Sequence, residues 1–144
     1  MRAGALESVM AGSHRNHACP CGTERKYKRC CLPLHNGKHA DTPEALMRSR
    51  YSAYALGLAE YVMATTHPDG PHFEADPGYW RDDLLAYCRA VQFQGLEVMS
   101  HAQHGDVGSV RFKAELSRDG EDVSFVEHSR FQRVDGHWLY HSAL

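Results

Sequence analysis

Four of the five cysteines in this 144-residue chain fall within thirteen positions and have the spacing of a metal site. They follow the pattern C-x-C-x8-C-C, at Cys19, Cys21, Cys30 and Cys31. Four thiolates complete the tetrahedral shell of a structural Zn²⁺ and leave no position for the water of a catalytic one. Adjacent cysteines are poor mutual disulfide partners, which disfavours a disulfide knot. The spacing therefore predicts one closed, structural zinc site.

Three further side chains bear on this chemistry. His35 and His39 follow the cysteines closely, and either could replace one sulfur as a ligand. The fifth cysteine, Cys88, lies beside leucines in a predicted helix, so we interpret it as a small buried hydrophobic residue. A lone thiol with no histidine assigned to it is a weak candidate for a nucleophile.

The loop between the two cysteine pairs is basic. It carries Arg25, Lys26, Lys28 and Arg29 around a single tyrosine. The first 40 residues hold seven Lys or Arg against two Asp or Glu, whereas the remainder holds nine against sixteen. Positive charge beside a four-thiolate zinc unit offsets its negative charge and attracts anionic partners such as RNA or an acidic protein face. We expect these four cations either to dock on such a partner or to remain a solvated loop.

A carboxylate on a predicted strand forms the second site of interest. Alternation along that strand places Glu127 on the same face as Phe125 and Phe131. A carboxylate on a buried face needs a partner, and Arg48 or Arg50 of a preceding helix could supply it. We expect an ion pair that holds the helix on the sheet. The alternative is that these residues line a pocket for a small polar ligand, or act as an acid and an electrostatic clamp.

The elements that must position these residues divide into helices followed by strands. Asp41 or Thr42 is the N-cap of a predicted helix that begins at Pro43 and buries tyrosines on its apolar stripe. Two shorter helices are predicted, over 59–66 and from 77 or 78 to 88, with a cluster of Pro, Gly and Asp between them. After position 91 the hydrophobic period changes to two. This predicts four antiparallel strands joined by short turns, at 95–102, 107–116, 123–134 and 137–140.

Three helices followed by a four-stranded antiparallel sheet indicate an α+β domain. The order resembles the nuclear transport factor 2-like (cystatin-like) cone, in which helices pack on a curved sheet. The cysteine pattern with its Lys-Tyr-Lys loop resembles the SEC-C motif, the small zinc-binding element found at the C-terminus of the secretion ATPase SecA. This chain has Thr23-Glu24 where Ser-Gly is common, a departure that touches the turn and not the ligands.

Taken together, these stretches resemble the YchJ-like family of bacterial proteins of unknown function. The matching segments are residues 19–31, Leu46 to Tyr54, Thr66 to Pro68, Leu96 to Val98, Glu127 to Phe131 and Gly136 to Trp138. The resemblance implies a SEC-C zinc element joined to a nuclear transport factor 2-like domain. It implies no established activity.

We therefore divide the chain into a disordered N-terminus at 1–18, a SEC-C zinc module at 19–40 with a closing turn at 32–37, and an α+β domain at 41–144. No run approaches eighteen apolar residues, so no membrane span is expected. The first eighteen residues lack the apolar core of a signal peptide, and free-thiol ligands suit a reducing compartment. Together these observations predict a cytoplasmic protein.

Two functions fit this organisation. The first is a non-enzymatic interaction module, a monomer or homodimer, whose basic SEC-C element docks on a protein or ribosome-like anionic partner. The second is a small-molecule-binding protein or enzyme that uses the interior of the cone. An open pocket facing Glu127 would favour the second function, and a cone filled by its own aromatic side chains would favour the first. Those aromatic residues are Phe93, Phe112, Phe125, Phe131 and Trp138.

Overall fold

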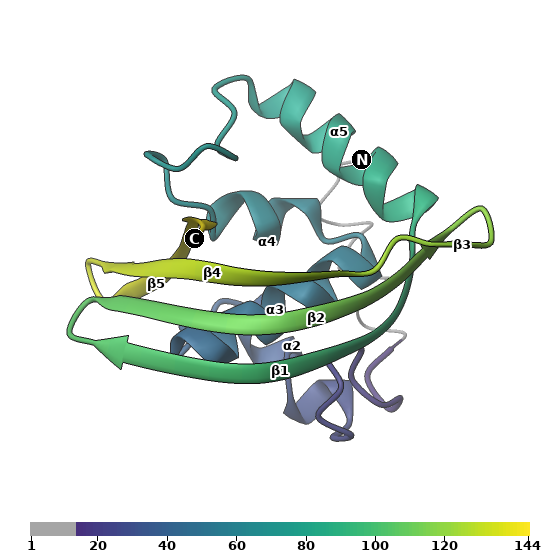
Figure 1. Cartoon of the computed structure of the whole chain (residues 1–144), viewed down its shortest axis with the longest axis horizontal. Coiled ribbons are helices and arrows are strands. Elements are labelled where there is room, and N and C mark those ends of the chain that lie inside the picture. The colour runs from purple at the N-terminus through teal and green to yellow at the C-terminus, as the bar shows by residue number, and fades with distance from the viewer. Residues whose placement is uncertain (1–13) are drawn as a thin grey trace.

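The computed structural model describes residues 14–144, in which α3 lies across a curved antiparallel sheet and α4 and α5 pack beside it (Figure 1). The helical elements are η1 (Tyr27–Arg29), α2 (Leu32–His35), α3 (Pro43–Leu56), α4 (Ala59–Ala64) and α5 (Pro77–Ala90). The strands are β1 (Gln92–His104), β2 (Val107–Arg118), β3 (Glu121–Asp122), β4 (Phe125–Val134) and β5 (His137–Ala143). The predicted α+β class is confirmed. Within this described part, every helix is too short or too polar to cross a membrane.

Helix α3 begins where its sequence signals predict. The hydroxyl oxygen of Thr42 accepts a hydrogen bond from the backbone N–H of Ala45 at 3.1 Å, and Pro43 occupies the first turn. The helix stops at Gly57, whose φ of 73° is left-handed and favours glycine. Asp76 caps α5 in the same way, because its carboxylate accepts from the first backbone N–H groups of that helix.

The sheet is an antiparallel meander in the order β1-β2-β4-β5. The strand predicted over 123–134 begins at Phe125, as β4, and a separate two-residue piece, β3, pairs with β2 ahead of it. Ser124 separates the two pieces: its hydroxyl oxygen accepts from the backbone N–H of Leu116 at 2.9 Å, in place of a backbone carbonyl. Two register shifts in β1, beside Gly95 and Ser100, are bulges of the kind that bend a strand. The bent strand helps the sheet to curve around α3.

The inner face of the sheet and α3 form one hydrophobic cluster. The inward residues of β2 are those that alternation predicts, namely Val110, Phe112, Ala114 and Leu116. They pack with buried residues of α3, β4 and β5, namely Leu46, Met47, Tyr51, Phe131, Trp138 and Tyr140. Burial of these side chains against α3 therefore sets the register of the strands.

The cysteine motif shares a second cluster with the helices. Tyr27 and Cys21 are both 0% exposed, and they pack in the same cluster as Leu56, Val62 and Trp80. The segment 32–37, predicted as a turn, begins instead as the short helix α2, which lies against α3. The motif is therefore built into the helical core of the domain.

The N-terminal segment predicted to be disordered covers residues 1–18. Of these, residues 1–13 lie outside the described part of the chain. The last part of the segment is paired with the basic loop. The backbone N–H of Tyr27 donates to the carbonyl of His17 at 2.8 Å, and Ala18 forms a β-bridge with Lys26. Residues 14–18 therefore extend the motif on its N-terminal side.

Candidate functional site

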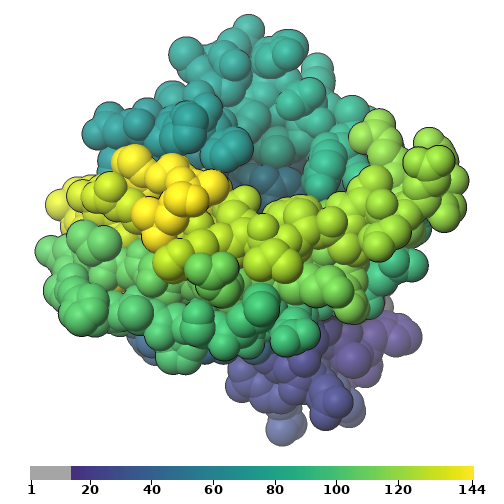
Figure 2. Space-filling view, in the orientation of Figure 1, coloured from purple at the N-terminus to yellow at the C-terminus, as the bar shows by residue number. Residues whose placement is uncertain are grey.

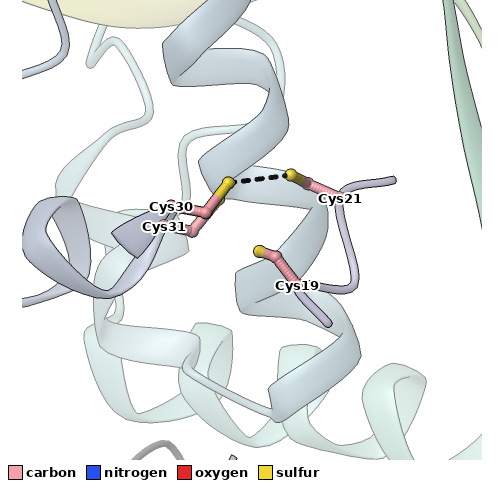
Figure 3. Close-up of side chains that lie close together, drawn as sticks. All are labelled: Cys19, Cys21, Cys30 and Cys31. Atoms are coloured by element: carbon pink, nitrogen blue, oxygen red, sulfur yellow. Dashed lines mark hydrogen bonds between the residues drawn. The ribbon is translucent and has the colours of Figure 1, made fainter. Parts of the chain in front are cut away.

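The four motif cysteines bring their sulfur atoms to one point. Cys19 and Cys21 come from one segment and face Cys30 and Cys31 of the other (Figure 3). The sulfurs of Cys21 and Cys30 lie 3.4 Å apart, those of Cys30 and Cys31 lie 4.0 Å apart, and all four lie within 4.8 Å of one another. Sulfurs around a tetrahedral zinc, with bonds of about 2.3 Å, are separated by about 3.8 Å. The predicted cluster is therefore a site that could hold a metal ion.

Backbone hydrogen bonds shape this cluster. The N–H of Cys19 donates to the carbonyl of Arg25 at 2.8 Å, and the N–H of Cys30 donates to the carbonyl of Tyr27 at 3.0 Å. Gly22 turns the chain with a φ of +85°, and a Cβ there would meet the carbonyl oxygen of Leu96 at 3.0 Å. Glycine is required at this position both by the left-handed backbone and by the close approach to β1.

The thiols of the cluster interact strongly. Hydrogen bonds from Cys19 and its neighbours lower the pKa of Cys30, and a hydrogen bond from Cys19 brings the pKa of Cys21 to about 6. The pKa values of Cys19 and Cys31 are raised, because their thiols donate to neighbouring sulfurs. The guanidinium of Arg25 also lies near, with Nη2 at 3.8 Å from the Cys30 sulfur. Cys21 and Cys30 are thus held toward the thiolate, which is the form that binds a metal, while Cys19 and Cys31 keep their protons as donors to them.

Neither histidine near the motif belongs to the cluster. His35 uses both ring nitrogens elsewhere: Nε2 donates to the carbonyl of Ser49 at 2.8 Å, and Nδ1 accepts from the hydroxyl of Tyr27 at 2.6 Å. This neutral tautomer fits the burial that lowers the pKa of His35 to about 4. His39 lies against His137, with their Nδ1 atoms 2.7 Å apart. Within residues 14–144 the ligand set is the four cysteines alone.

The basic loop surrounds the cluster on its outer side. Arg25, Lys26 and Arg29 are exposed, and Lys28 is half-buried. None of the four forms an ion pair with another residue of the described chain. Arg25 contacts the Cys30 sulfur, and the charges of Lys26, Lys28 and Arg29 have no carboxylate partner in the described chain.

A cavity of about 730 Å³ lies between α3, α5 and the inner face of the sheet. Figure 2 shows its mouth as a hollow between α5 and β4, with the blue of the α3 and α4 region visible inside. Trp138 does not line this cavity. The other four aromatic residues expected to fill the cone line it instead, namely Phe93, Phe112, Phe125 and Phe131.

Glu127 faces this cavity, as alternation along its strand predicts, but the expected ion pair is wrong. In the described structure neither Arg48 nor Arg50 forms a salt bridge with Glu127. Its Oε2 instead accepts hydrogen bonds from the hydroxyl of Tyr140, at 2.9 Å, and from the hydroxyl of Ser129. Two neutral donors on the same sheet thus satisfy one carboxylate oxygen, and no cation from α3 is needed for it.

The two arginines of α3 have separate roles. Arg48 points toward the cysteine motif, where Nη1 donates to the carbonyl of Cys21 at 2.8 Å and Nε pairs with Glu44 at 2.9 Å. Arg50 lines the cavity and is only 7% exposed. Its Nη1 donates to neutral acceptors at the end of α4, namely the carbonyl of Val62 and the hydroxyls of Thr65 and Thr66.

Tyr140 is the residue of the cavity floor that sequence reasoning missed. Its hydroxyl donates to Glu127, and its ring lies under the guanidinium of Arg50, 4.8 Å from the ring centroid to Cζ. It is placed by backbone pairing of β5 with the end of α4, where Tyr140 N–H donates to the carbonyl of Thr65 at 2.8 Å. No local pattern predicts this pairing, because the two segments lie far apart in the sequence.

Cys88 is half-buried on α5 and lies outside the cluster of four cysteines.

The chain matches known families over most of its length. Residues 42–143 match the family described as YchJ, middle NTF2-like domain, and residues 15–33 match the SEC-C motif. A UPF0225 protein of Deinococcus radiodurans is 44% identical over 124 residues, which cover 85% of this chain and 85% of that protein. The chain belongs to the YchJ-like UPF0225 family. The SEC-C element and the nuclear transport factor 2-like domain implied by the sequence are therefore both confirmed.

Two solved structures of SEC-C motif proteins have the same fold. The solution structure of RPA3114 from Rhodopseudomonas palustris is 34% identical, with a TM-score of 0.73 over 88% of this chain and 96% of that one. A crystal structure from Psychrobacter arcticus is 27% identical, with a TM-score of 0.77 over 90% of this chain and 82% of that one. The fold of this chain is thus shared by two other proteins that contain a SEC-C motif.

Proposed function

We propose that this protein binds a small molecule in the cavity between α3, α5 and the sheet, while its cysteine motif holds a structural Zn²⁺. The observation that carries the first part is the cavity itself. Its volume of about 730 Å³ is within the range of small-molecule sites, which is about 300 to 1,000 Å³. Its lining also has the composition of such sites, with aromatic walls and a few polar groups at the floor.

An open cone is the feature that separates this function from a purely structural domain. A domain that serves only as a scaffold gains stability by filling its interior, because unfilled space forfeits packing contacts. Here Phe93 and Phe112 stand at the wall of the cavity and leave the centre open. A ligand would recover the lost contacts.

The uncharged dye Nile red, which fluoresces in apolar sites, tests this proposal. We expect one dye to bind per folded chain. We also expect Ala86→Trp, which adds a large ring at the cavity wall on an exposed position of α5, to abolish binding. Ala55→Trp, a half-buried α3 position that does not line the cavity, is the control. Near-ultraviolet circular dichroism establishes that each variant remains folded. Equal dye binding by both variants would overturn the proposal.

Zinc is the metal that the four-sulfur set suits best. Closed tetrahedral sites of four thiolates are typical of Zn²⁺, with iron as the main competitor. When bound, the ion would crosslink the two cysteine segments and supply no chemistry of its own. Elemental analysis of protein purified without added metal should find one zinc per chain, and Cys30→Ser should lower this content. Stoichiometric iron in place of zinc would contradict the assignment.

A second function is supported by the basic loop. Arg25, Lys26 and Arg29 project from the motif without ion pairs in the described chain, which suits docking on a ribosome-like anionic surface. Replacing the loop cations by Glu should reduce the fraction of protein that cosediments with purified ribosomes, and should make that fraction less sensitive to salt. Ala86→Trp, which alters the cavity, should leave cosedimentation unchanged. Equal cosedimentation of the charge-reversed protein would indicate a solvated loop.

Either function would operate in the cytoplasm, where reducing conditions preserve the thiolates.

A further inference from the structure

Arg50 is a buried cation that lacks an anionic partner within the described protein. Three neutral acceptors at the end of α4 take hydrogen bonds from Nη1. Nε and Nη2 make no hydrogen bond with any described residue, although the side chain lines the cavity. Burial lowers the pKa of this guanidinium, because its charged form has lost most of its water. A buried charge in such a setting is stabilised by a counter-ion.

Glu127 provides the complementary charge at the same floor. Its Oε2 is bound by two hydroxyl donors, from Ser129 and Tyr140, whereas Oε1 makes no hydrogen bond in the described chain. The ring of Tyr140 lies between the two charges, under Arg50 and bonded to Glu127. One positive and one negative group therefore share the floor without pairing with each other.

The remaining charges of the cavity lie toward its mouth. Asp83 on α5 and Arg118 on β2 are exposed, and Glu74 on the loop before α5 is half-buried. Water screens Asp83 and Arg118, so they influence a bound ligand less than the buried Arg50 does, and Glu74 is half-buried, as Glu127 is. The inner floor is the part that selects the head group of a ligand.

The walls above the floor are aromatic. Tyr54 stacks on Phe93 with ring centroids 6.3 Å apart, and Phe112 contacts Phe125 edge-on at 6.1 Å. The hydroxyl of Tyr54 makes no hydrogen bond with a described residue, and burial raises its pKa. The walls suit a flat or branched apolar group, and this hydroxyl adds one more polar contact near the floor.

We propose that the ligand is a small zwitterion with an apolar body, which has the chemistry of a hydrophobic α-amino acid. Its carboxylate would bind the free guanidinium nitrogens of Arg50, and its ammonium group would bind the free oxygen of Glu127. This inference rests on the proposed ligand site in the cone. An anion without an amine would be repelled by Glu127, and an amine without a carboxylate would be repelled by Arg50. The two unpaired charges thus favour a molecule that carries both signs on one head group.

Three probes that share one phenyl ring test the head-group requirement. They are L-phenylalanine, 3-phenylpropionate, which lacks the amine, and 2-phenylethylamine, which lacks the carboxylate. In isothermal titration calorimetry with the full, zinc-loaded chain we expect L-phenylalanine to bind at least tenfold more tightly than either analogue. Equal or tighter binding of 3-phenylpropionate would overturn the inference in favour of a plain carboxylate.

Glu127→Gln provides the matched variant, because it keeps the shape and the two hydroxyl contacts while removing the charge. We expect it to weaken L-phenylalanine binding at least tenfold and to strengthen 3-phenylpropionate binding. Glu115→Gln, at an exposed position on the outer face of β2, should change neither. Unchanged L-phenylalanine binding by Glu127→Gln would also overturn the inference.

The dye experiment separates this inference from the ligand site on which it rests. If the dye binds in the cavity but none of the phenyl probes does, the zwitterion inference fails and the ligand site stands. If the cavity variant leaves dye binding unchanged as well, both fail. Binding of L-phenylalanine that Ala86→Trp abolishes and Glu115→Gln leaves intact supports both.

Discussion

The hydroxyl of Tyr27 offers a direct measure of how firmly the cysteine motif is joined to the rest of the domain. This hydroxyl donates to Nδ1 of His35 at 2.6 Å, and the opposite ring nitrogen donates to the carbonyl of Ser49 on α3. Two hydrogen bonds through His35 thus link η1, α2 and α3. Tyr27→Phe removes the first donor of this link and keeps the ring that packs in the core.

The cost of this change follows from burial. Tyr27 is 0% exposed, so no water replaces the lost donor, and Nδ1 of His35 remains unsatisfied. A buried acceptor without a partner costs about 1 to 3 kcal/mol. For a chain of this length each kcal/mol lowers Tm by about 3 to 4 °C, so we expect a fall of about 3 to 12 °C.

Urea and thermal unfolding of the zinc-loaded protein, followed by circular dichroism at pH 7.5, would measure the effect. Tyr79→Phe removes the same hydroxyl from a ring that is 62% exposed and serves as the control. Because Tyr27 shares a cluster with the helices, the whole domain should unfold earlier in a single transition with an unchanged slope in urea. Equal stability of the two variants would refute the reasoning, and so would a separate early transition of the motif alone.

Three other substitutions probe the same junction. Burial lowers the pKa of His35 to about 4, below its value of about 6.5 in the unfolded chain, so the neutral ring stabilises the fold above pH 6.5. We expect up to about 3 kcal/mol of unfolding free energy to be lost as the pH falls from 6.5 to 4. His35→Gln should reduce this pH dependence in urea titrations. Arg48→Met removes the hydrogen bond to the carbonyl of Cys21, and should cost about 1.5 to 3 kcal/mol and speed the loss of metal to a chelator. Gly22→Ala forces a side chain into left-handed backbone beside the carbonyl of Leu96, and should cost at least about 1 kcal/mol of unfolding free energy, whereas no change would show that the turn relaxes freely.

The contrast between Glu127 and its expected partners shows the limit of local reasoning. Alternation along one strand is a local property, and it correctly directs Glu127 to the inner face. The choice of partner depends on distances between α3, the end of α4 and β5, which no spacing in the chain encodes. Arg50 is drawn instead to the acceptors of Thr65 and Thr66, and Tyr140 takes the place next to the carboxylate.

The division of the chain into a metal module and a domain had a similar limit. The motif is short and rich in polar residues, so by itself it has no visible core. In the fold, the apolar sides of Tyr27 and Leu32 complete a cluster with Val62 and Trp80, which come from distant segments. Loss of metal from a Cys30→Ser variant should accordingly lower the stability of the whole domain, and not only that of residues 19–39.

Features that depend on neighbouring residues could be predicted from the sequence alone. The spacing of the cysteines identified a cluster that could hold a metal ion, the N-cap Thr42 and Pro43 placed the start of α3, and the change of hydrophobic period separated helices from strands. Each is encoded within a few residues, because turns, caps and alternation act locally. Three features appear only in the folded chain: the cone stays open, Arg50 and Glu127 do not pair within it, and the motif joins the core. Those outcomes depend on how surfaces from remote segments fit together, and that fit is a property of the packed chain as a whole.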